Sequence, residues 1–319
     1  MFSLNPDAQS MMHRFGVRLL TLPLNIPMPD SKRKAKPEVS IIGAGRLGTT
    51  LAVALSRRGY SIRSIVSRRA QSARKAAKLL EGNPQVLAAN KLQSLSPADL
   101  FLITTPDDQI APVVAELSTL ETKPNRKLTA LHTSGALSSE VLAPLRRKGW
   151  NTGSIHPLIS VSDSRNGATR LQGAFWSVEG DKGALRLGKA IVRDLEGQSF
   201  SIRSEDKPLY HAAAVMTAGN VVALFDVALE MLGQCGLSRK TARSILFPLL
   251  VSTVRNLETK DPVDALTGSF SRGDVETVKR HIAALKSNRL SDALELYRLL
   301  GKRSLRLSKK YPQIEEILK

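Results

Sequence analysis

Short apolar runs alternate with stretches of helical spacing over residues 39–204. The runs predict strands at residues 39–42, 61–66, 100–104, 128–132, 153–156, 175–178 and 199–202. The stretches between them predict helices, among them residues 49–58, 69–80 and 138–148. Because strands that alternate with helices form sheets covered on both faces, the pattern predicts an α/β fold with a doubly wound, mostly parallel sheet. Ligands of such sheets bind at the carboxyl ends of the strands.

The pattern becomes helical after Ser204. Strand-like runs stop there, and the spacing predicts helices at residues 207–235, 238–257, 274–287 and 291–307. Breaks at glycine and proline limit these helices to lengths that a bundle can use. We therefore expect an α/β domain over residues 37–204 and an all-helical domain over residues 205–319.

Residues 1–36 differ in composition from both domains. Arg14, Arg18 and a basic run at residues 32–36 stand against only two acids in this segment. Such a composition is typical of a leader, for example a transit peptide. A flexible extension, or a true start at Met28, explains it equally well. The expected fold does not include this segment.

The first predicted strand runs directly into a glycine-rich turn. In Gly43-x-Gly45-x-x-Gly48 the first glycine permits a tight turn, the second lets backbone approach a pyrophosphate, and the third lets the next helix pack against the sheet. The first N–H groups of that helix then face the anion. The alternative is a glycine turn in an unrelated α/β protein. With strands on both sides of the motif we predict a dinucleotide site. Its expected contacts are Gly43, Ala44, Gly45, Arg46, Leu47 and Gly48.

The end of the second predicted strand indicates which dinucleotide binds. NAD-binding domains carry an Asp or Glu about twenty residues after the glycines, and its carboxylate binds the ribose hydroxyls. This chain has Ser67, Arg68 and Arg69 there and no acid. A hydroxyl and two guanidinium groups suit a phosphate, since each charge-assisted hydrogen bond contributes roughly 1.5–3 kcal/mol. The sequence therefore predicts NADP, unless these arginines belong to a solvated turn.

Composition narrows the classes of function. A chain of 319 residues with 42% apolar content suits two domains with a real core. The net charge of +19 is spread over the whole chain and aromatic residues make up 4%, so we expect no nucleic-acid partner. A single cysteine, Cys235, excludes an internal disulfide and is expected in the core of a reduced, cytoplasmic protein without a metal site. The most apolar stretch, residues 245–254, is short for a membrane helix of about 20 residues, so no membrane segment is expected.

Small and polar residues follow the third predicted strand. Thr104, Thr105 and Pro106 are expected to shape the wall of the cofactor site. Either Asp107 or Asp108 is expected to cap the next helix.

Two later strand ends carry candidate catalytic residues. Ser134 would hydrogen-bond the nicotinamide carboxamide or a substrate oxygen, or else cap the helix that starts near Ser138. His156 would bind a substrate carboxylate, donate a proton, or form a structural hydrogen bond. Both are therefore candidates with structural alternatives.

The start of the helical half holds the remaining catalytic candidates. Lys207 and His211 lie four residues apart and share a helix face if the helix already includes Lys207. Reduction of a carbonyl or imine needs a proton donor at the heteroatom, and either side chain could supply it. Asn220 could orient the substrate, although it lies on the opposite face of a regular helix unless Gly219 permits a distortion. Close helix packing is the alternative that the many alanines favour.

A glycine-punctuated loop precedes the helix predicted at residues 274–287. Asp274 is a natural N-cap for that helix. Thr267, Arg272 and His281 could reach an anionic substrate from the helical side, or tie the loop to the helix.

Together these residues resemble a Rossmann-like oxidoreductase family whose C-terminal half is a domain of unknown function. The resemblance covers most of residues 38–300. It rests on the Gly43 turn, Ser67-Arg68, His132-x-Ser134-Gly135, His156-Pro157-Leu158, Tyr210 through Asn220, and Leu266 through His281. More distantly, the architecture is similar to pyrroline-5-carboxylate reductase, ketopantoate reductase and the 3-hydroxyacid dehydrogenases. His211 stands where the hydroxyacid dehydrogenases have an asparagine four residues after the lysine.

The resemblance implies an NADP-dependent oxidoreductase whose substrate lies between a Rossmann domain and a helical domain that forms a homodimer. We expect a small, carboxylated carbonyl, hydroxy or imine substrate, with a ketopantoate-reductase-like activity as the specific candidate. The alternative is a protein that binds NADP as a sensory or structural ligand without turnover.

Overall fold

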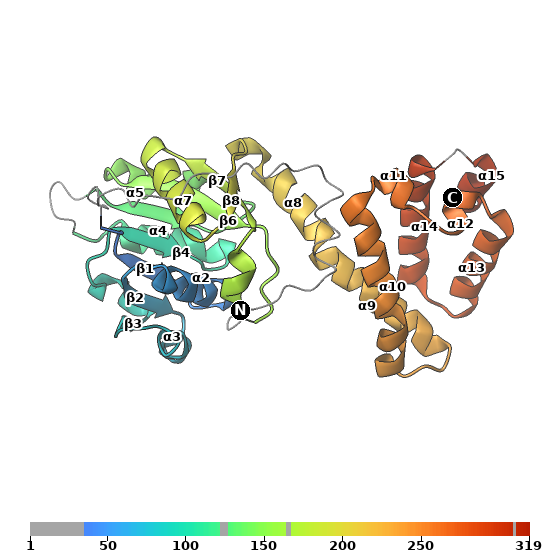
Figure 1. Cartoon of the computed structure of the whole chain (residues 1–319), viewed down its shortest axis with the longest axis horizontal. Helices are drawn as coiled ribbons and strands as arrows, with labels where there is room; N and C mark the ends of the chain where they lie inside the picture. The colour runs from blue at the N-terminus through green and yellow to red at the C-terminus, as the bar shows by residue number, and fades with distance from the viewer. Residues whose placement is uncertain (1–34, 122–126, 164–166, 309–310) are drawn as a thin grey trace, which may run out of the picture. The chain divides into compact units, whose positions relative to one another are not determined.

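A single sheet forms the centre of the N-terminal half (Figure 1). The computed structural model describes residues 35–121, 127–163, 167–308 and 311–319. Within these residues the strand order is β3-β2-β1-β4-β5-β6-β7-β8. The strands are β1 (Val39–Ile42), β2 (Ile62–Ser67), β3 (Gln85–Ala88), β4 (Leu100–Ile103), β5 (Thr129–His132), β6 (Asn151–Pro157), β7 (Phe175–Gly180) and β8 (Gln198–Phe200). All neighbouring strands pair in parallel except β6 and β7, which confirms the predicted α/β sheet.

The chain reverses its direction of travel across the sheet next to β1. From β1 it moves outward to β2 and β3, and it then returns to β4 on the other side of β1. A doubly wound sheet opens a crevice at such a point, beyond the carboxyl ends of the two strands. The crevice between β1 and β4 is therefore where the fold positions a ligand.

Helices cover both faces of the sheet. The helices of this half are α2 (Arg46–Arg57), α3 (Ala70–Ala77), α4 (Ile110–Leu117), α5 (Ala143–Arg147) and α7 (Lys182–Asp194), with 3-10 turns η2 (Ala89–Ser94), η3 (Asp107–Gln109), η4 (Ser139–Leu142), η5 (Ala168–Leu171) and η6 (Ser204–Asp206). On one face Ile41 packs with Leu55 of α2 and Ile191 of α7. On the other face Ile42 packs with Val114 of α4. Because both faces are buried, β1 is apolar at nearly every position and does not alternate.

Three sequence expectations for this half need correction. The strand β3 was not predicted, because it is a four-residue edge strand in which only Leu87 is buried. The helix α2 begins at Arg46 rather than at residue 49, since the glycine motif itself forms its first turn. The last strand, β8, ends at Phe200 and is shorter than the run predicted at 199–202.

The C-terminal half is helical, as predicted (Figure 1). Its helices are α8 (Lys207–Thr217), α9 (Gly219–Gln234), α10 (Arg239–Thr259), α11 (Pro262–Ala265), α12 (Ser269–Arg272), α13 (Val275–Ser287), α14 (Ser291–Leu307) and α15 (Pro312–Ile317). A small core of Val278, Ile282, Leu305, Ile314 and Leu318 joins α13, α14 and α15. The short helices α11, α12 and α15 were not predicted.

The helices α9 and α10 bury very little in the single chain. Leu229 is the buried side chain of α9, and Ala242 is that of α10. Cys235, expected in the core, is exposed at the end of α9, so that expectation was wrong.

One helical run is long and apolar enough to cross a membrane by length and composition. It spans Ser204–Gln234, has 31 residues and a mean hydropathy of 1.8, and 6% of its most apolar window is buried. The expectation that no stretch reaches this length was wrong, because α8 and α9 follow each other with only Ala218 between them. The expected leader at residues 1–36 lies almost wholly outside the described residues.

Candidate functional site

The glycine turn after β1 has the geometry of a nucleotide-binding turn. Gly43 has φ of +119°, and a Cβ there would lie 2.6 Å from the carbonyl carbon of Thr104. A Cβ on Gly48 would lie 1.9 Å from the carbonyl oxygen of Gly43, so α2 can approach β1 only with glycine at this position. A Cβ on Gly45 would meet nothing within 4 Å. The middle glycine therefore leaves open space in front of the helix, as a pyrophosphate requires.

A cleft of about 460 Å³, here called the nucleotide cleft, lies over this turn. It is lined by Gly45, Arg46, Leu47, Thr104, Thr105, Pro106, Asp107, Thr133, Ser134, Gly135, His156, Pro157, Ile159, Val161 and His211. The first turn of α2 carries no acid that would repel an anion. Among the described residues, the buried hydroxyl of Thr105 has no hydrogen-bond partner, which leaves it free for a ligand. The cleft thus brings together residues predicted from four separate strand ends.

The residues predicted to select NADP lie at the end of β2. Ser67 is the last residue of that strand, and Arg68 and Arg69 follow it with exposed side chains. Arg69 has extended backbone and precedes the first residue of α3. None of the three lines the nucleotide cleft itself. Two exposed cations at this strand end suit a phosphate at the far end of a dinucleotide.

Ser134 has its hydrogen bonds within the protein. Its hydroxyl donates to Oδ2 of Asp107 at 2.8 Å and accepts from the backbone N–H groups of Ala136 and Leu137 at 3.1 and 2.9 Å. Asp107 therefore accepts a hydrogen bond from Ser134. Neither Asp107 nor Asp108 caps the helix that follows, so the capping role expected from the sequence was wrong. Ser134 shapes the loop after β5, and Ser138 caps the turn η4.

Lys207, the first residue of α8, is buried against residues of the sheet domain. Its side chain has 0% relative exposure, and Nζ donates to Oγ of Ser154 at 2.7 Å and to the carbonyl oxygen of Ser134 at 3.2 Å. Oε1 of Glu179 lies 4.0 Å away. Burial lowers the pKa of Lys207, and Glu179 and Asp107 oppose that shift. Lys207 does not line the nucleotide cleft, and its hydrogen bonds connect the start of α8 to β6 and to the loop after β5.

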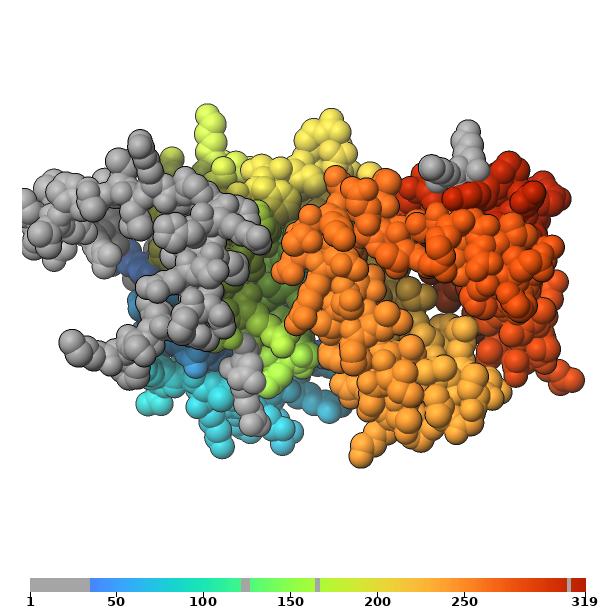
Figure 2. All heavy atoms as spheres, turned by 45° about the vertical axis from the view of Figure 1, so that its right-hand side comes forward, coloured from blue at the N-terminus to red at the C-terminus, as the bar shows by residue number. Residues whose placement is uncertain are grey.

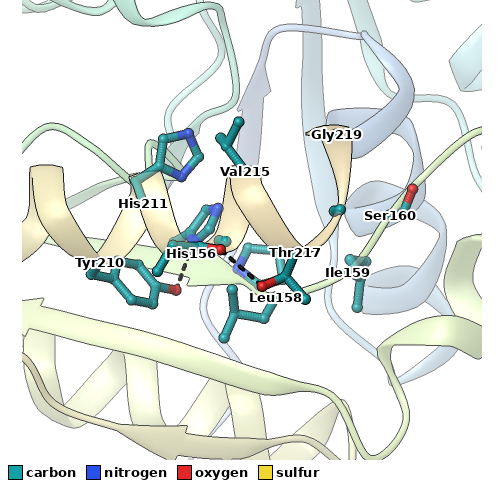
Figure 3. A pocket seen from close by; sticks show the side chains of 13 residues that line it. His156, Leu158, Ile159, Ser160, Tyr210, His211, Val215, Thr217 and Gly219 are labelled. Atoms are coloured by element: carbon teal, nitrogen blue, oxygen red, sulfur yellow. Dashed lines mark hydrogen bonds between the residues drawn. The ribbon is translucent and has the colours of Figure 1, made fainter. Parts of the chain in front are cut away.

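Two imidazoles meet beside Gly135. A Cβ on Gly135 would lie 2.3 Å from Nδ1 of His211 and 2.9 Å from Nε2 of His156, so only glycine allows both rings to approach. The rings are edge to face with centroids 5.3 Å apart. Figure 3 shows His156 and Tyr210 joined by a hydrogen bond, which is 2.8 Å long between Nδ1 and the hydroxyl.

The two imidazoles differ in what remains available for a ligand. Burial, with His211 and Lys207 nearby, lowers the pKa of His156 to about 4, so His156 is neutral at neutral pH. Burial raises the pKa of its partner Tyr210 to about 12. Nδ1 of His211 is buried and has no hydrogen-bond partner among the described residues. Of the two imidazoles, His211 is therefore the one with a buried nitrogen still free to hydrogen-bond a ligand.

A second cleft begins where the nucleotide cleft ends. This α8 cleft has a volume of about 540 Å³ and lies between the end of β6 and one face of α8 (Figure 3). It is lined by His156, Pro157, Leu158, Ile159, Ser160, Tyr210, His211, Ala213, Ala214, Val215, Thr217, Ala218 and Gly219. The two clefts share His156, Pro157, Ile159 and His211. The imidazole pair thus stands at the border between the two clefts.

The other candidates of the helical half lie outside both clefts. α8 does begin at Lys207, but the helix breaks at Ala218, and Asn220 is exposed on α9. Thr267 and Arg272 are exposed, and Nδ1 of His281 bonds the hydroxyl of Tyr297 at 2.8 Å.

The predicted N-cap of α13 is present. The side chain of Asp274 accepts from the N–H of Thr277 at 3.1 Å. This confirms the capping role expected from the sequence.

Two domain profiles match the chain. Residues 25–157 match a Rossmann-like domain, and residues 174–304 match the domain of unknown function DUF2520. The chain combines a Rossmann-like domain with a DUF2520 domain. The family resemblance inferred from the sequence is confirmed. No curated protein matches the sequence of this Rossmann–DUF2520 protein.

Several solved structures share the fold of the Rossmann–DUF2520 protein. A protein of Bacteroides fragilis, provisionally named an NADP oxidoreductase, is 23% identical with a TM-score of 0.69, and the match covers 85% of this chain and 98% of that one. A reductive aminase from Aspergillus terreus, solved with NADPH, is 16% identical with a TM-score of 0.61 over 88% and 99% of the two chains. A pyrroline-5-carboxylate reductase from Streptococcus pyogenes is 18% identical with a TM-score of 0.55 over 81% and 96%. These similarities show the fold.

Three residues of the site were not assigned a role from the sequence. Tyr210 was part of a motif, but its bond to His156 joins residues 54 positions apart. Glu179 accepts from the N–H and the hydroxyl of Ser139 at 2.6 and 2.8 Å, and it lies in a mostly apolar strand. Gly135 was noted only as part of a motif. An acid within a predicted strand, as at Glu179, is the signal by which the sequence could have indicated a buried polar cluster.

A third histidine, His132, is fully buried and holds the loop after β5. Nε2 of His132 bonds the carbonyl oxygen of Ser138 at 3.2 Å, and Nδ1 accepts from the N–H of Ser134 at 3.2 Å. A neutral ring satisfies both bonds. Burial, with the charge of Lys207 as the second cause, lowers the pKa of His132 to about 3.

We expect His132 to make the stability of the fold sensitive to acid. Below pH 6.5 the unfolded chain takes up a proton at this residue, whereas the folded chain does not until about pH 3. The free energy of unfolding therefore falls as the pH falls through this window, by about 2 kcal/mol between pH 7 and pH 5 from His132 alone. Urea unfolding of the native chain and of His132→Gln at both pH values measures this. An equal loss in the two proteins would contradict the prediction.

Proposed function

We propose that this protein is an NADP-dependent oxidoreductase that transfers a hydride between NADP(H) and a small carbonyl, hydroxy or imine compound. The imidazole pair on the border between the two clefts carries the proposal. One cleft has the turn of a nucleotide site, and the other is a separate cavity of substrate size. That NADP oxidoreductases share the fold supports the assignment.

The chain's own residues fit NADP. The open position at Gly45 and the first turn of α2 would hold the pyrophosphate. Arg68, with Ser67 and Arg69, would bind the 2′-phosphate. Thr105 would offer its hydroxyl within the nucleotide cleft. When bound, NADPH supplies the hydride.

The proton for the heteroatom would come from His211. Its buried Nδ1 lacks a protein partner among the described residues, and the residue lines both clefts. The neutral His156, held by Tyr210, would orient the substrate beside it. Positioned proton transfer of this kind accelerates reactions by about 10²–10⁴-fold.

A titration with NADPH and with NADH tests the cofactor assignment. We expect Arg68→Ala to raise the dissociation constant for NADPH at least about tenfold, because it removes a charge-assisted bond worth roughly 1.5–3 kcal/mol. The affinity for NADH should be poor and unchanged. Arg74→Ala, which removes an exposed arginine of α3, is the matched control. If neither dinucleotide binds the native protein, the oxidoreductase proposal is wrong.

The competing function is an NADP-binding protein without turnover. It would bind NADPH through the same turn and would consume none in the presence of any carbonyl or imine. Replacement of His211 and His156 separates the two functions, since an enzyme loses turnover and keeps its cofactor, whereas a sensor has no turnover to lose.

We also propose a soluble, cytoplasmic homodimer joined through α9 and α10 of the helical domain. Large apolar side chains are exposed along these helices: Val222, Leu224, Ile245, Phe247, Leu249, Val254 and Leu257. Exposed apolar area on this scale marks a surface that another molecule covers. A second copy suits it better than lipid, because Arg239, Lys240 and Arg243 line the groove between α9 and α10 beside the apolar side chains.

A charge placed in the groove between α9 and α10 should dissociate the dimer. Val222 and Phe247 line this groove and are 71% and 50% exposed in the single chain. We expect Val222→Asp and Phe247→Asp to reduce the mass measured by light scattering from twice 34.7 kDa to 34.7 kDa. Leu79→Asp, at another exposed apolar position, should leave the mass unchanged. If the native protein has the mass of one chain, the proposed dimer is wrong.

A further inference from the structure

The α8 cleft has no charged side chain in its wall. Of its lining residues, eight are apolar or glycine: Pro157, Leu158, Ile159, Ala213, Ala214, Val215, Ala218 and Gly219. The polar ones are His156, Ser160, Tyr210, His211 and Thr217. No lysine, arginine, aspartate or glutamate is among the described residues that line it.

Most of the polar atoms in this wall already have partners. The hydroxyl of Thr217 donates to the carbonyl oxygen of Ala213 at 2.9 Å. The hydroxyl of Tyr210 is bonded to Nδ1 of His156. Ser160 lies at the exposed rim. The buried polar atom left for a ligand is Nδ1 of His211.

A carboxylate would find no counter-charge in this cleft. Moving an ionised carboxylate from water to such a wall without a cation costs several kcal/mol. Neither imidazole is left to compensate, because His156 is neutral with its pKa lowered to about 4 and His211 is the group that serves the reacting heteroatom. Lys207 is enclosed and already bonded to Ser134 and Ser154. A carbonyl or imine, by contrast, needs one hydrogen-bond donor, which is what His211 offers.

We infer that the substrate is an uncharged, largely apolar ketone, aldehyde or imine, whose apolar part lies against α8 and whose heteroatom faces His211. This inference rests on the proposed function and replaces the expectation of a small carboxylated substrate. The cavity of about 540 Å³ also holds more than a keto acid of a few carbons. In the reaction, the carbonyl or imine carbon gains the hydride of NADPH, and its heteroatom gains a proton through His211. The C=O or C=N π bond is lost, NADPH becomes NADP⁺, and His211 is reprotonated from water.

Two probes of similar size and different charge test the inference. Methyl 4-acetylbenzoate and 4-acetylbenzoate carry the same ketone on the same ring, and the second has a carboxylate where the first has an uncharged methyl ester. With the full chain and NADPH, consumption of NADPH gives kcat/KM, and saturation-transfer NMR with NADP⁺ present gives binding without turnover. We expect the ester to bind and to be reduced with kcat/KM at least about 100-fold above that of the acid.

A cation placed in the wall should reverse this preference. Val215 lines the α8 cleft and is 42% exposed, whereas its neighbour Met216 is 66% exposed and does not line it. We expect Val215→Lys to improve kcat/KM or binding of the acid relative to the ester at least tenfold. Met216→Lys, with the same charge one residue further on, should change the ratio less than twofold.

The outcomes separate this inference from the proposed function. Absence of NADPH binding would contradict the function itself. If NADPH binds but the acid binds as well as the ester, or neither probe binds, the inference is wrong while the cofactor assignment stands. If Val215→Lys and Met216→Lys change the preference for the acid equally, the cleft does not bind the substrate, and the inference is wrong as well.

Discussion

Replacing His211 with phenylalanine should lower kcat about 10²–10⁴-fold while the affinity for NADPH changes less than twofold. His211 holds the buried nitrogen that awaits a partner at the border of the two clefts. Phenylalanine keeps a ring beside Gly135 and His156 and removes the donor, so the fold is preserved. Steady-state rates with NADPH and a reducible ketone, together with NADPH titration, measure both quantities.

Two further variants show whether the loss is specific. Tyr210→Phe removes the hydroxyl bonded to His156, and it should alter the pH profile of kcat more than its maximum. His281→Phe changes an exposed histidine of α13 that lines neither cleft and should retain activity. If His211→Phe keeps more than a tenth of kcat, the proton comes from another group.

Replacing Lys207 with methionine should lower the free energy of unfolding by about 3–5 kcal/mol, because removing one member of a buried charged cluster leaves its partners without compensation. The substitution removes the hydrogen bonds of the ammonium to Ser154 and to the carbonyl oxygen of Ser134. It also removes the positive charge next to Glu179. Equilibrium unfolding in urea measures the loss.

Controls for this variant come from the same chain. Lys189→Met, at an exposed position of α7, should change stability by less than about 0.5 kcal/mol. Adding Glu179→Gln to Lys207→Met should recover part of the loss, since the carboxylate is then no longer unpaired. A Lys207→Met protein as stable as the Lys189→Met control would show that the ammonium is not needed for the fold.

The cofactor half of the site was predictable because its signals are local. Gly43, Gly45 and Gly48 lie within six residues, and the steric limits at Gly43 and Gly48 hold in the structure. The basic pair Arg68 and Arg69 directly after β2 was equally predictable, because the apolar run of a strand shows where that strand ends. Strand β3 escaped prediction because an edge strand of four residues buries too little to produce such a run.

The substrate half was not predictable in the same way. The spacing of Lys207 and His211 suggested two equivalent proton donors, but packing gave them different surroundings. Lys207 is enclosed by Ser134 and Ser154, which lie 73 and 53 positions earlier in the chain. His211 meets Gly135 and His156 and keeps an unbonded nitrogen.

The sequence by itself determined the α/β sheet, the helical C-terminal half and the glycine turn with its basic strand end. These depend on periodicity and on contacts between near neighbours in the chain. Only the tertiary structure decided which polar side chains are buried, which are paired and which face a cleft. Burial and pairing set the charge of His156, the enclosure of Lys207 and the uncharged wall of the α8 cleft, and each depends on residues brought together from distant strands.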